Sequence, residues 1–79
     1  MRLDKYLKVS RLIKRRTVAR EACDQGRVSV NGKTAKAGAA VKPGDVIEIV
    51  FGNRTVKAEI LDVSETVRKE EAKEMYRYI

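Results

Sequence analysis

The sequence predicts an α+β fold in which two N-terminal helices pack on a small antiparallel sheet, followed by a short C-terminal helix. Apolar side chains recur at helical spacing over residues 3–25, and from residue 27 they alternate with polar ones at the period of a strand. Turn-forming dipeptides separate the expected strands. A chain of 79 residues has room for one domain, so residues 1–79 are expected to fold together.

The first helix is expected over residues 3–9. Leu3, Tyr6 and Leu7 share one side of it at i, i+3 and i+4 spacing, so this side packs against the rest of the chain. Basic side chains three residues apart occupy the opposite side, which therefore faces solvent or a ligand. Residues 10–14 form a connection to the next element.

The second helix is expected over residues 16–25 and ends at Gly26, because glycine is the usual residue after a helix C-terminus. Arg16 and Arg20 lie one turn apart on one face of this helix. Its apolar arc, next to that face, consists of Val18, Ala19, Ala22 and Cys23.

Four strands are expected after the second helix, at residues 27–30, 33–36, 46–51 and 54–63. The dipeptide Asn31-Gly32 is the strongest hairpin signal in the chain and joins the first two strands. Pro43-Gly44 predicts a turn of type II character before the third strand. A hairpin turn at residues 52–53 joins the last two strands.

The last element is expected to be a helix over residues 67–78, with Ser64 or Thr66 as its cap. Its apolar stripe consists of Ala72, Met75, Tyr76 and Ile79. The basic Arg68 and Lys69 are balanced by nearby glutamates, so no ligand is assigned to this helix. It is expected to be a packing element.

The composition favours a binding module over an enzyme. The chain has no histidine, which removes the commonest general base and metal ligand, and its one cysteine excludes an internal disulfide. No phosphate-binding loop or dinucleotide motif is present. We therefore expect no cofactor and no metal, and a reduced Cys23 in the core. An enzyme with unrecognised chemistry is a disfavoured alternative.

The net charge of +7 is concentrated at the N-terminus. Residues 1–20 hold eight basic side chains and one acidic one, Asp4, whereas residues 21–79 hold ten of each sign. Arginine and lysine on adjoining helices suit a phosphate backbone, because neutralising phosphates releases counterions. Aromatic residues are few, which favours recognition of structured RNA by shape over stacking of single-stranded bases.

A membrane partner is the second hypothesis, because a basic helix can bind a lipid surface. It is disfavoured, since Leu3, Tyr6 and Leu7 are needed for the core and no Trp or Phe flanks the basic side chains. No apolar run approaches the length of about 20 residues that spans a bilayer. A secretory signal is also absent, so a cytoplasmic protein is expected.

Three segments carry a resemblance to a known family. RLDKYL, RRTVAREACDQGRVSVNGKTAK and VKPGD follow one another in the order and spacing of the RNA-binding domain named after small-subunit ribosomal protein S-four. The resemblance covers residues 1–50 and implies an αL fold, with rRNA or tRNA bound across the helix pair and the adjoining β-turn. Residues 51–79 add the returning strand and the C-terminal helix.

Among stand-alone proteins with this domain, the opening segment is most similar to the family of ribosome-associated quality-control factor P, to which heat-shock protein fifteen is related. This resemblance implies binding of large-subunit rRNA and peptidyl-tRNA. It also implies support for C-terminal tailing of stalled chains by a partner that recruits tRNA. The protein itself is expected to be a monomer. Ribosome assembly, a heat-shock role on rRNA and a tRNA-binding accessory role remain alternatives.

The candidate RNA-binding residues combine the basic side chains with the positions of the family motif. Arg16 and Arg20 are the strongest candidates for phosphate contacts. Asp4 is either only a helix-dipole residue or a functional one that orients an arginine or accepts from RNA hydroxyls. Arg15 stands where many members have a capping Ser or Thr. The full set is Arg2, Asp4, Lys5, Lys8, Arg11, Lys14, Arg15, Arg16, Arg20, Gln25, Arg27, Asn31, Gly32 and Lys33, with Gly26 as a further motif position.

Overall fold

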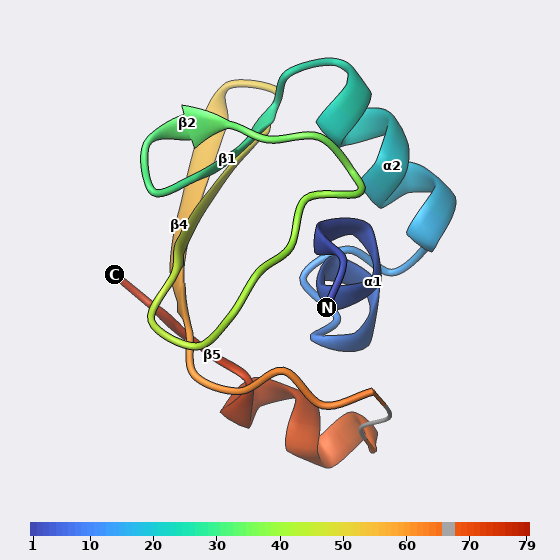
Figure 1. Ribbon diagram of the computed structural model, residues 1–79, viewed down its shortest axis with the longest axis vertical. Helices are drawn as coiled ribbons and strands as arrows, with labels where there is room; N and C mark the ends of the chain where they lie inside the picture. Colours follow the sequence, from blue (N-terminus) through green and yellow to red (C-terminus); the bar gives the residue numbers. More distant parts are fainter. Residues whose placement is uncertain (66–67) are drawn as a thin grey trace.

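The computed structural model describes residues 1–65 and 68–79. Within them the chain begins with the helices α1 (Leu3–Val9) and α2 (Arg16–Asp24) (Figure 1). An antiparallel sheet of order β2-β1-β3-β4-β5 follows. Its strands are β1 (Val28–Val30), β2 (Lys33–Thr34), β3 (Val46–Phe51), β4 (Arg54–Ile60) and β5 (Tyr76–Tyr78), and the 3₁₀ helix η1 (Lys69–Glu74) precedes β5. The predicted fold class is confirmed.

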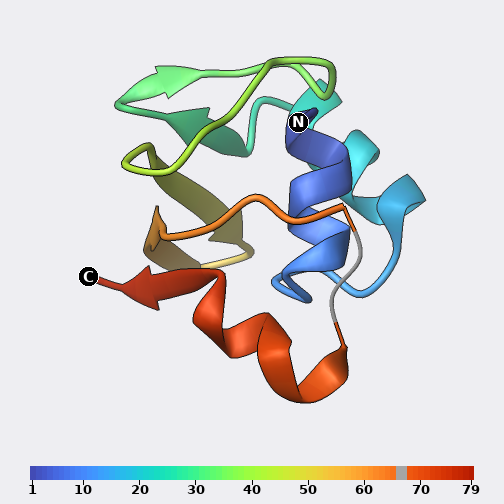
Figure 2. The same cartoon turned by 60° about the horizontal axis from the view of Figure 1, so that its bottom comes forward.

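Both helices lie on one side of the sheet (Figure 2). Strand residues that point to this side are buried and close the core with Leu3, Tyr6 and Leu7 of α1, none of which is exposed. Each such burial stabilises the fold by about 1.5–3 kcal/mol. The strand residues of the core are Val28, Ile47, Ile49, Ala58 and Ile60.

The other side of the sheet carries charged cross-strand pairs. Glu48 lies opposite Lys57 and forms an ion pair with it at 3.5 Å, and Glu59 lies opposite Arg77 and pairs with it as well. Opposite charges at facing positions stabilise adjacent strands. Along β3, β4 and β5, these acidic and basic side chains therefore neutralise one another.

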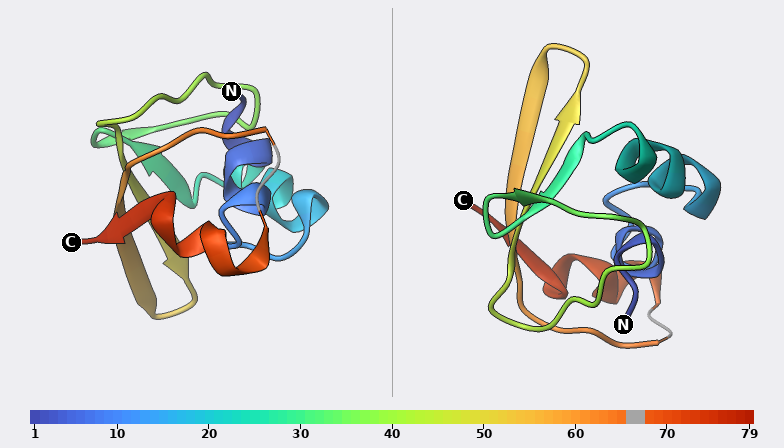
Figure 3. Two further views of the ribbon diagram at one scale, coloured as in Figure 1. Left: turned by 90° about the horizontal axis from the view of Figure 1, so that it is seen from below. Right: turned by 45° about the horizontal axis from the view of Figure 1, so that its top comes forward.

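The N-terminus of α1 is held by a loop far away in sequence. The backbone N–H of Leu3 donates to the carbonyl of Ala39 at 2.8 Å, and that of Asp4 donates to Ala37 at 3.1 Å. The N–H of Lys5 donates to the Asp4 carboxylate at 2.8 Å. These bonds satisfy the donors that the first turn of a helix leaves without intrahelical partners. The loop 35–41 therefore lies against the start of α1 (Figure 3).

The two turns with strong sequence signals form as predicted. Asn31 and Gly32 both have positive φ, 53° and 83°, as a type I′ hairpin requires. Gly44 has a φ of 96°, and the N–H of Asp45 donates to the Lys42 carbonyl at 3.2 Å, which is the pattern of a type II turn.

The helix expected over 67–78 is wrong in type and extent. The chain forms η1 and then β5, which pairs with β4 in antiparallel register. The edge of β4 offers backbone hydrogen bonds that a helix at this position cannot use, and the alternating tyrosines Tyr76 and Tyr78 suit a strand. Ser64 does not cap the element, because its hydroxyl bonds Asp62 instead. Thr66 and residue 67 lie outside the described residues.

Smaller differences concern the ends of elements and one apolar side chain. β4 ends three residues before the predicted limit of 63, since the N–H groups of Leu61 and Asp62 both turn to the carbonyl of Met75. β2 ends at Thr34 rather than at residue 36, and α2 ends one residue early. Val18 is 45% exposed and lies outside the core, unlike the other members of its predicted arc.

Tyr6 joins the two ends of the chain. Its hydroxyl donates a hydrogen bond of 2.7 Å to the backbone carbonyl of Met75, just before β5. Burial raises the pKa of the Tyr6 phenol well above its usual range, so the group remains a donor. The same carbonyl accepts from Leu61 at 2.8 Å, so one oxygen holds α1, the end of β4 and the start of β5 together.

Arg11, the residue after the C-cap of α1, has a left-handed backbone conformation with a φ of 65°. Glycine is the low-cost residue at such a position, because a β-carbon there is strained. We expect Arg11→Gly to raise the free energy of unfolding by about 1 kcal/mol. Urea unfolding should show a higher midpoint with an unchanged slope. Arg11→Ala removes the same charge and keeps the β-carbon, so a comparable gain in that variant would contradict the explanation.

Candidate nucleic-acid interface

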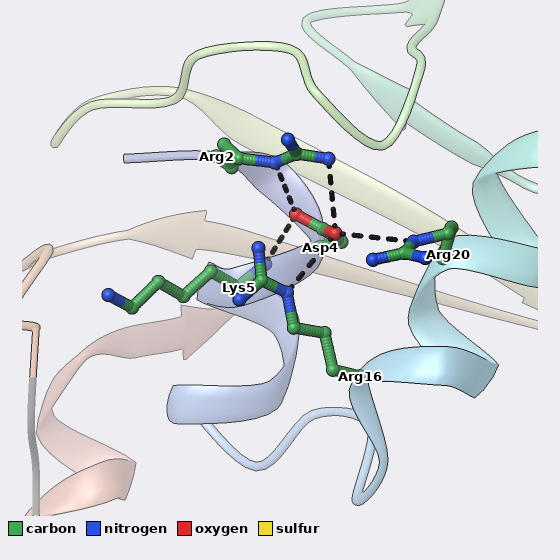
Figure 4. Close-up of polar contacts among 5 residues, drawn as sticks. All are labelled: Arg2, Asp4, Lys5, Arg16 and Arg20. Carbon is green, nitrogen blue, oxygen red and sulfur yellow. Dashed lines mark hydrogen bonds and ion pairs between the residues drawn. The ribbon is translucent and has the colours of Figure 1, made fainter.

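A buried carboxylate organises the cationic end of the molecule. Asp4 lies in the first turn of α1, and its side chain has no exposed surface. Three arginine side chains converge on it: Arg2 from the segment before α1, and Arg16 and Arg20 from α2 (Figure 4). The spacing of Arg16 and Arg20 by one helical turn places both on the face of α2 that meets α1.

The three arginines contact Asp4 in two different ways. Arg2 makes a two-pronged contact, with Nε 3.1 Å from Oδ1 and Nη2 3.4 Å from Oδ2. Arg16 uses Nε, at 3.2 Å from Oδ2, and Nε of Arg20 is 3.8 Å from the same oxygen. The contacts of Arg16 and Arg20 therefore leave their terminal Nη groups to other partners.

The ionisation of Asp4 follows from this arrangement. Burial opposes the charged form, but hydrogen bonds from Arg16, Arg2 and the backbone of Lys5 outweigh it, so the pKa of the carboxyl lies below its ordinary value of 3.8. Asp4 is therefore an anion at neutral pH. It lies at the positive end of α1 and orients arginine side chains, whereas the predicted contact with RNA hydroxyls is wrong because the carboxylate has no exposed surface.

The buried anion pre-organises the cations around it. Arginine carries about 2 kcal/mol of rotamer entropy, which a flexible side chain loses when it binds a ligand. Here Asp4 restricts three arginines during folding, while their side chains keep exposed fractions of 53% for Arg2, 41% for Arg16 and 55% for Arg20. The result is a rigid cationic surface suited to phosphate oxygens. We call these four residues the Asp4 cluster.

Lys5 lies beside the cluster, but its ammonium group forms an ion pair with Glu65. Glu65 belongs to the segment after β4, and the ammonium of Lys5 lowers the pKa of its carboxyl. This contact directs the Lys5 side chain away from Asp4 (Figure 4). Lys5 thus contributes its backbone N–H to the cluster and its charge to a neighbouring pair.

The other predicted site residues lie outside the cluster. Four are exposed basic residues at the end of α1 and in the connection to α2: Lys8, Arg11, Lys14 and Arg15. Arg15 is the residue before α2 and makes no side-chain cap there, in keeping with its departure from the family motif. These side chains extend the cationic surface along the α1–α2 connection.

A second group of predicted residues follows α2. Gln25 and Arg27 flank the turn into β1, and Gly26 lies beside Thr34 of β2, so this turn adjoins the β1–β2 hairpin. The exposed Gly32 and Lys33 stand at the hairpin itself. The Asn31 amide group is engaged within the protein, because its nitrogen donates to Asp45 at 3.1 Å and its oxygen accepts from the Val46 N–H at 2.9 Å.

Sequence reasoning missed the loop that adjoins the cluster. A β-carbon at Gly38 would lie 3.8 Å from the guanidinium carbon of Arg2, so this residue is a neighbour of the candidate site. Ala37 and Ala39 hold the first turn of α1 through their carbonyls. The loop carries no periodic pattern, and its closeness to Arg2 depends on the fold. The only sequence signal for this loop is a single glycine, Gly38, among small residues.

The structure leaves the membrane hypothesis without the apolar side chains that it requires. Leu3, Tyr6 and Leu7, which would have to enter a lipid surface, are fully buried. In residues 1–65 and 68–79, no helix is both long and apolar enough to cross a bilayer.

Cys23 is buried as predicted. Burial raises the pKa of its thiol to about 11, so the thiol is unsuited to act as a nucleophile at neutral pH.

Comparisons with known proteins agree with this architecture. The model of the S4 domain family matches residues 1–47. The chain is 64% identical over 76 residues to the RQC P-site tRNA stabilizing factor of Halalkalibacterium halodurans, covering 96% of this chain and 86% of the relative. It is 57% identical to the Bacillus subtilis protein of the same name, with 96% and 88% covered.

A solved structure shows the same fold over the whole chain. The trimeric Heat Shock Protein 15 of Vibrio cholerae superposes with a TM-score of 0.92 at 34% identity, covering 100% of this chain and 81% of that one. The helix pair, the sheet and the family match define an S4-domain protein. With relatives this similar over nearly its full length, the chain belongs to the family of RQC P-site tRNA stabilizing factors. The resemblance inferred from the motifs is confirmed.

We expect Asp4→Asn to lower the free energy of unfolding at pH 7 by about 2 kcal/mol, because the variant loses the charge that holds the arginines. The pKa of Asp4 is depressed in the folded state, so this stabilisation is present above the ordinary carboxyl pKa and is lost as the pH falls below about 4. Urea unfolding at pH 7 and at low pH measures both effects.

In that experiment, the difference between wild type and Asp4→Asn should shrink as the pH falls. Asp24→Asn provides the control, because Asp24 is an exposed carboxylate at the end of α2 and should leave stability nearly unchanged. A pH-independent difference between wild type and Asp4→Asn would contradict the role of the ionised carboxylate.

Proposed function

We propose that this protein binds RNA of the large ribosomal subunit through the Asp4 cluster and acts in ribosome-associated quality control. The observation that carries the proposal is the convergence of three arginines on one buried carboxylate, at the end of the chain that holds the whole net charge. The names of its relatives support it, since they are called RQC P-site tRNA stabilizing factors. The protein acts by binding and has no catalytic step.

The finer proposal has two RNA partners. The Asp4 cluster and the basic α1–α2 connection bind large-subunit rRNA and peptidyl-tRNA, mainly through the phosphate backbone. By holding the tRNA, the protein supports C-terminal tailing of the stalled chain by a partner that recruits further tRNA. It does so as a monomer in the cytoplasm. Its proposed RNA-facing set is the one predicted from the sequence without Asp4, whose side chain is fully buried, and Arg16 and Arg20 lie at its centre.

Purification of the tagged protein from cells, followed by sequencing of the bound RNA, tests this assignment. Large-subunit rRNA together with tRNA, and without small-subunit rRNA, is the expected result. Precursor rRNA without tRNA would instead favour the alternative role in ribosome assembly. Recovery of RNA at the level of an untagged control would overturn the proposed function.

We expect Arg16→Ala and Arg20→Ala each to weaken co-sedimentation with purified large subunits by about tenfold or more, because each removes a charge-assisted contact to phosphate. Urea unfolding should show that both variants remain folded. Arg68→Ala is the matched control, since Arg68 is exposed but lies beside η1, and it should bind like wild type. Wild-type co-sedimentation by both folded cluster variants would place the RNA elsewhere.

The affinity for large subunits should fall steeply with salt. A slope of log Kd against log salt equivalent to several phosphates, on the order of 4–7, is expected for a contact dominated by the RNA backbone. The slope should decrease by about one for Arg16→Ala. A titration from low to physiological salt measures both, and a flat response would contradict a phosphate-dominated mode.

A further inference from the structure

Within the Asp4 cluster, the guanidinium of Arg2 is held differently from the other two. Its Nε and Nη2 both contact the Asp4 carboxylate, at 3.1 and 3.4 Å, so one edge of the planar group is fixed by a fork. Arg16 hydrogen-bonds Asp4 through Nε alone, at 3.2 Å, which leaves its end free to grip a phosphate. The Nε and Nη2 groups of Arg2, with which arginine usually binds a phosphate, are therefore already engaged by Asp4.

Gly38 lies over one face of the same guanidinium. A β-carbon at Gly38 would be 3.8 Å from both Cζ and Nη2 of Arg2, and more than 4 Å from Nε and Nη1. A point in the guanidinium plane that is equally distant from two bonded atoms would approach a third nitrogen more closely. The β-carbon position therefore lies above the plane, so Gly38 is the residue next to that face and places no side chain on it.

Two sides of the Arg2 guanidinium thus adjoin the protein. Asp4 occupies one edge, and Gly38 borders one face. The Arg2 side chain is nevertheless 53% exposed, so the face opposite Gly38 is taken as the one that a flat ligand approaches. Guanidinium planes fixed in this way stack on unpaired nucleobases in RNA recognition.

We propose that Arg2 is a stacking platform for one unpaired RNA base, beside the phosphate contacts of Arg16 and Arg20. This inference rests on the proposed RNA-binding function and names the part of the RNA that Arg2 recognises. The Asp4 cluster then recognises more than charge. Arg16 and Arg20 bind the RNA backbone, and Arg2 requires an unpaired base. A continuous duplex lacks such a base.

The test compares RNAs with identical phosphates. Three stem-loops carry, at one bulged position, an adenosine, a uridine or an abasic residue, and binding to the full chain is measured by fluorescence anisotropy. Wild type should bind the adenosine RNA about tenfold more tightly than the abasic RNA, with uridine between them, as stacking area dictates. Equal binding of the three RNAs, or no binding to any of them, would overturn the stacking proposal.

Arg2→Lys keeps the positive charge and removes the plane. This variant should bind all three RNAs with the affinity that wild type has for the abasic RNA, and its salt dependence should match that of wild type. Retention of the preference for adenosine by folded Arg2→Lys would overturn the role of Arg2. If the variant does not fold, the wild-type order of the three RNAs still decides the proposal.

Gly38→Ala is the matched control. Gly38 does not require positive φ, and its new β-carbon would meet Arg2 at an ordinary contact distance on the face away from the proposed base. The preference for adenosine should therefore be unchanged, whereas its loss would contradict the assigned face. Co-sedimentation with large subunits tests the proposed function separately, because it can persist when the three small RNAs are bound equally.

Discussion

The structure depends on one buried negative charge. Asp4 accepts a hydrogen bond from the backbone at the start of α1, holds α2 through Arg16 and fixes Arg2. An isolated carboxylate would be costly to bury, and the guanidinium groups around it offset that cost. The contact that joins the two helices and the contact that orients the cations of the candidate site are therefore the same, so the helix pair cannot change its packing without changing that site.

The parts of the fold that local signals determine were predictable from the sequence. Both helices and β3 follow their apolar periods, and the turns at Asn31-Gly32 and Gly44 follow from residues that accept positive φ. The C-terminal helix was wrong because pairing with the edge of β4 is a long-range interaction that an apolar stripe does not reveal. The candidate site divides in the same way: charge and spacing identified the arginines, whereas their convergence on Asp4 and the position of Gly38 appear only in the folded chain.

Residues after the S4 match also hold α1, the helix that carries Asp4. The family model ends at residue 47, yet Ile60 of β4 and Met75, between η1 and β5, belong to the same core. Their link to α1 is the Met75 carbonyl, which accepts from Tyr6 and from the backbone after β4. This oxygen fixes the far side of α1, while Asp4 fixes the side that faces α2. A helix of two turns is thus held along its length by groups from both ends of the chain.

The paired charges on the outer side of the sheet also affect how the protein approaches its partner. Glu48 with Lys57 and Glu59 with Arg77 cancel locally, and residues 21–79 carry no net charge, so the excess positive charge lies in residues 1–20. A molecule whose net charge lies at one end is oriented by a polyanion before contact, so a larger fraction of diffusional encounters is productive. On the proposed function, the neutralised outer side of β3, β4 and β5 thereby contributes to the rate of association.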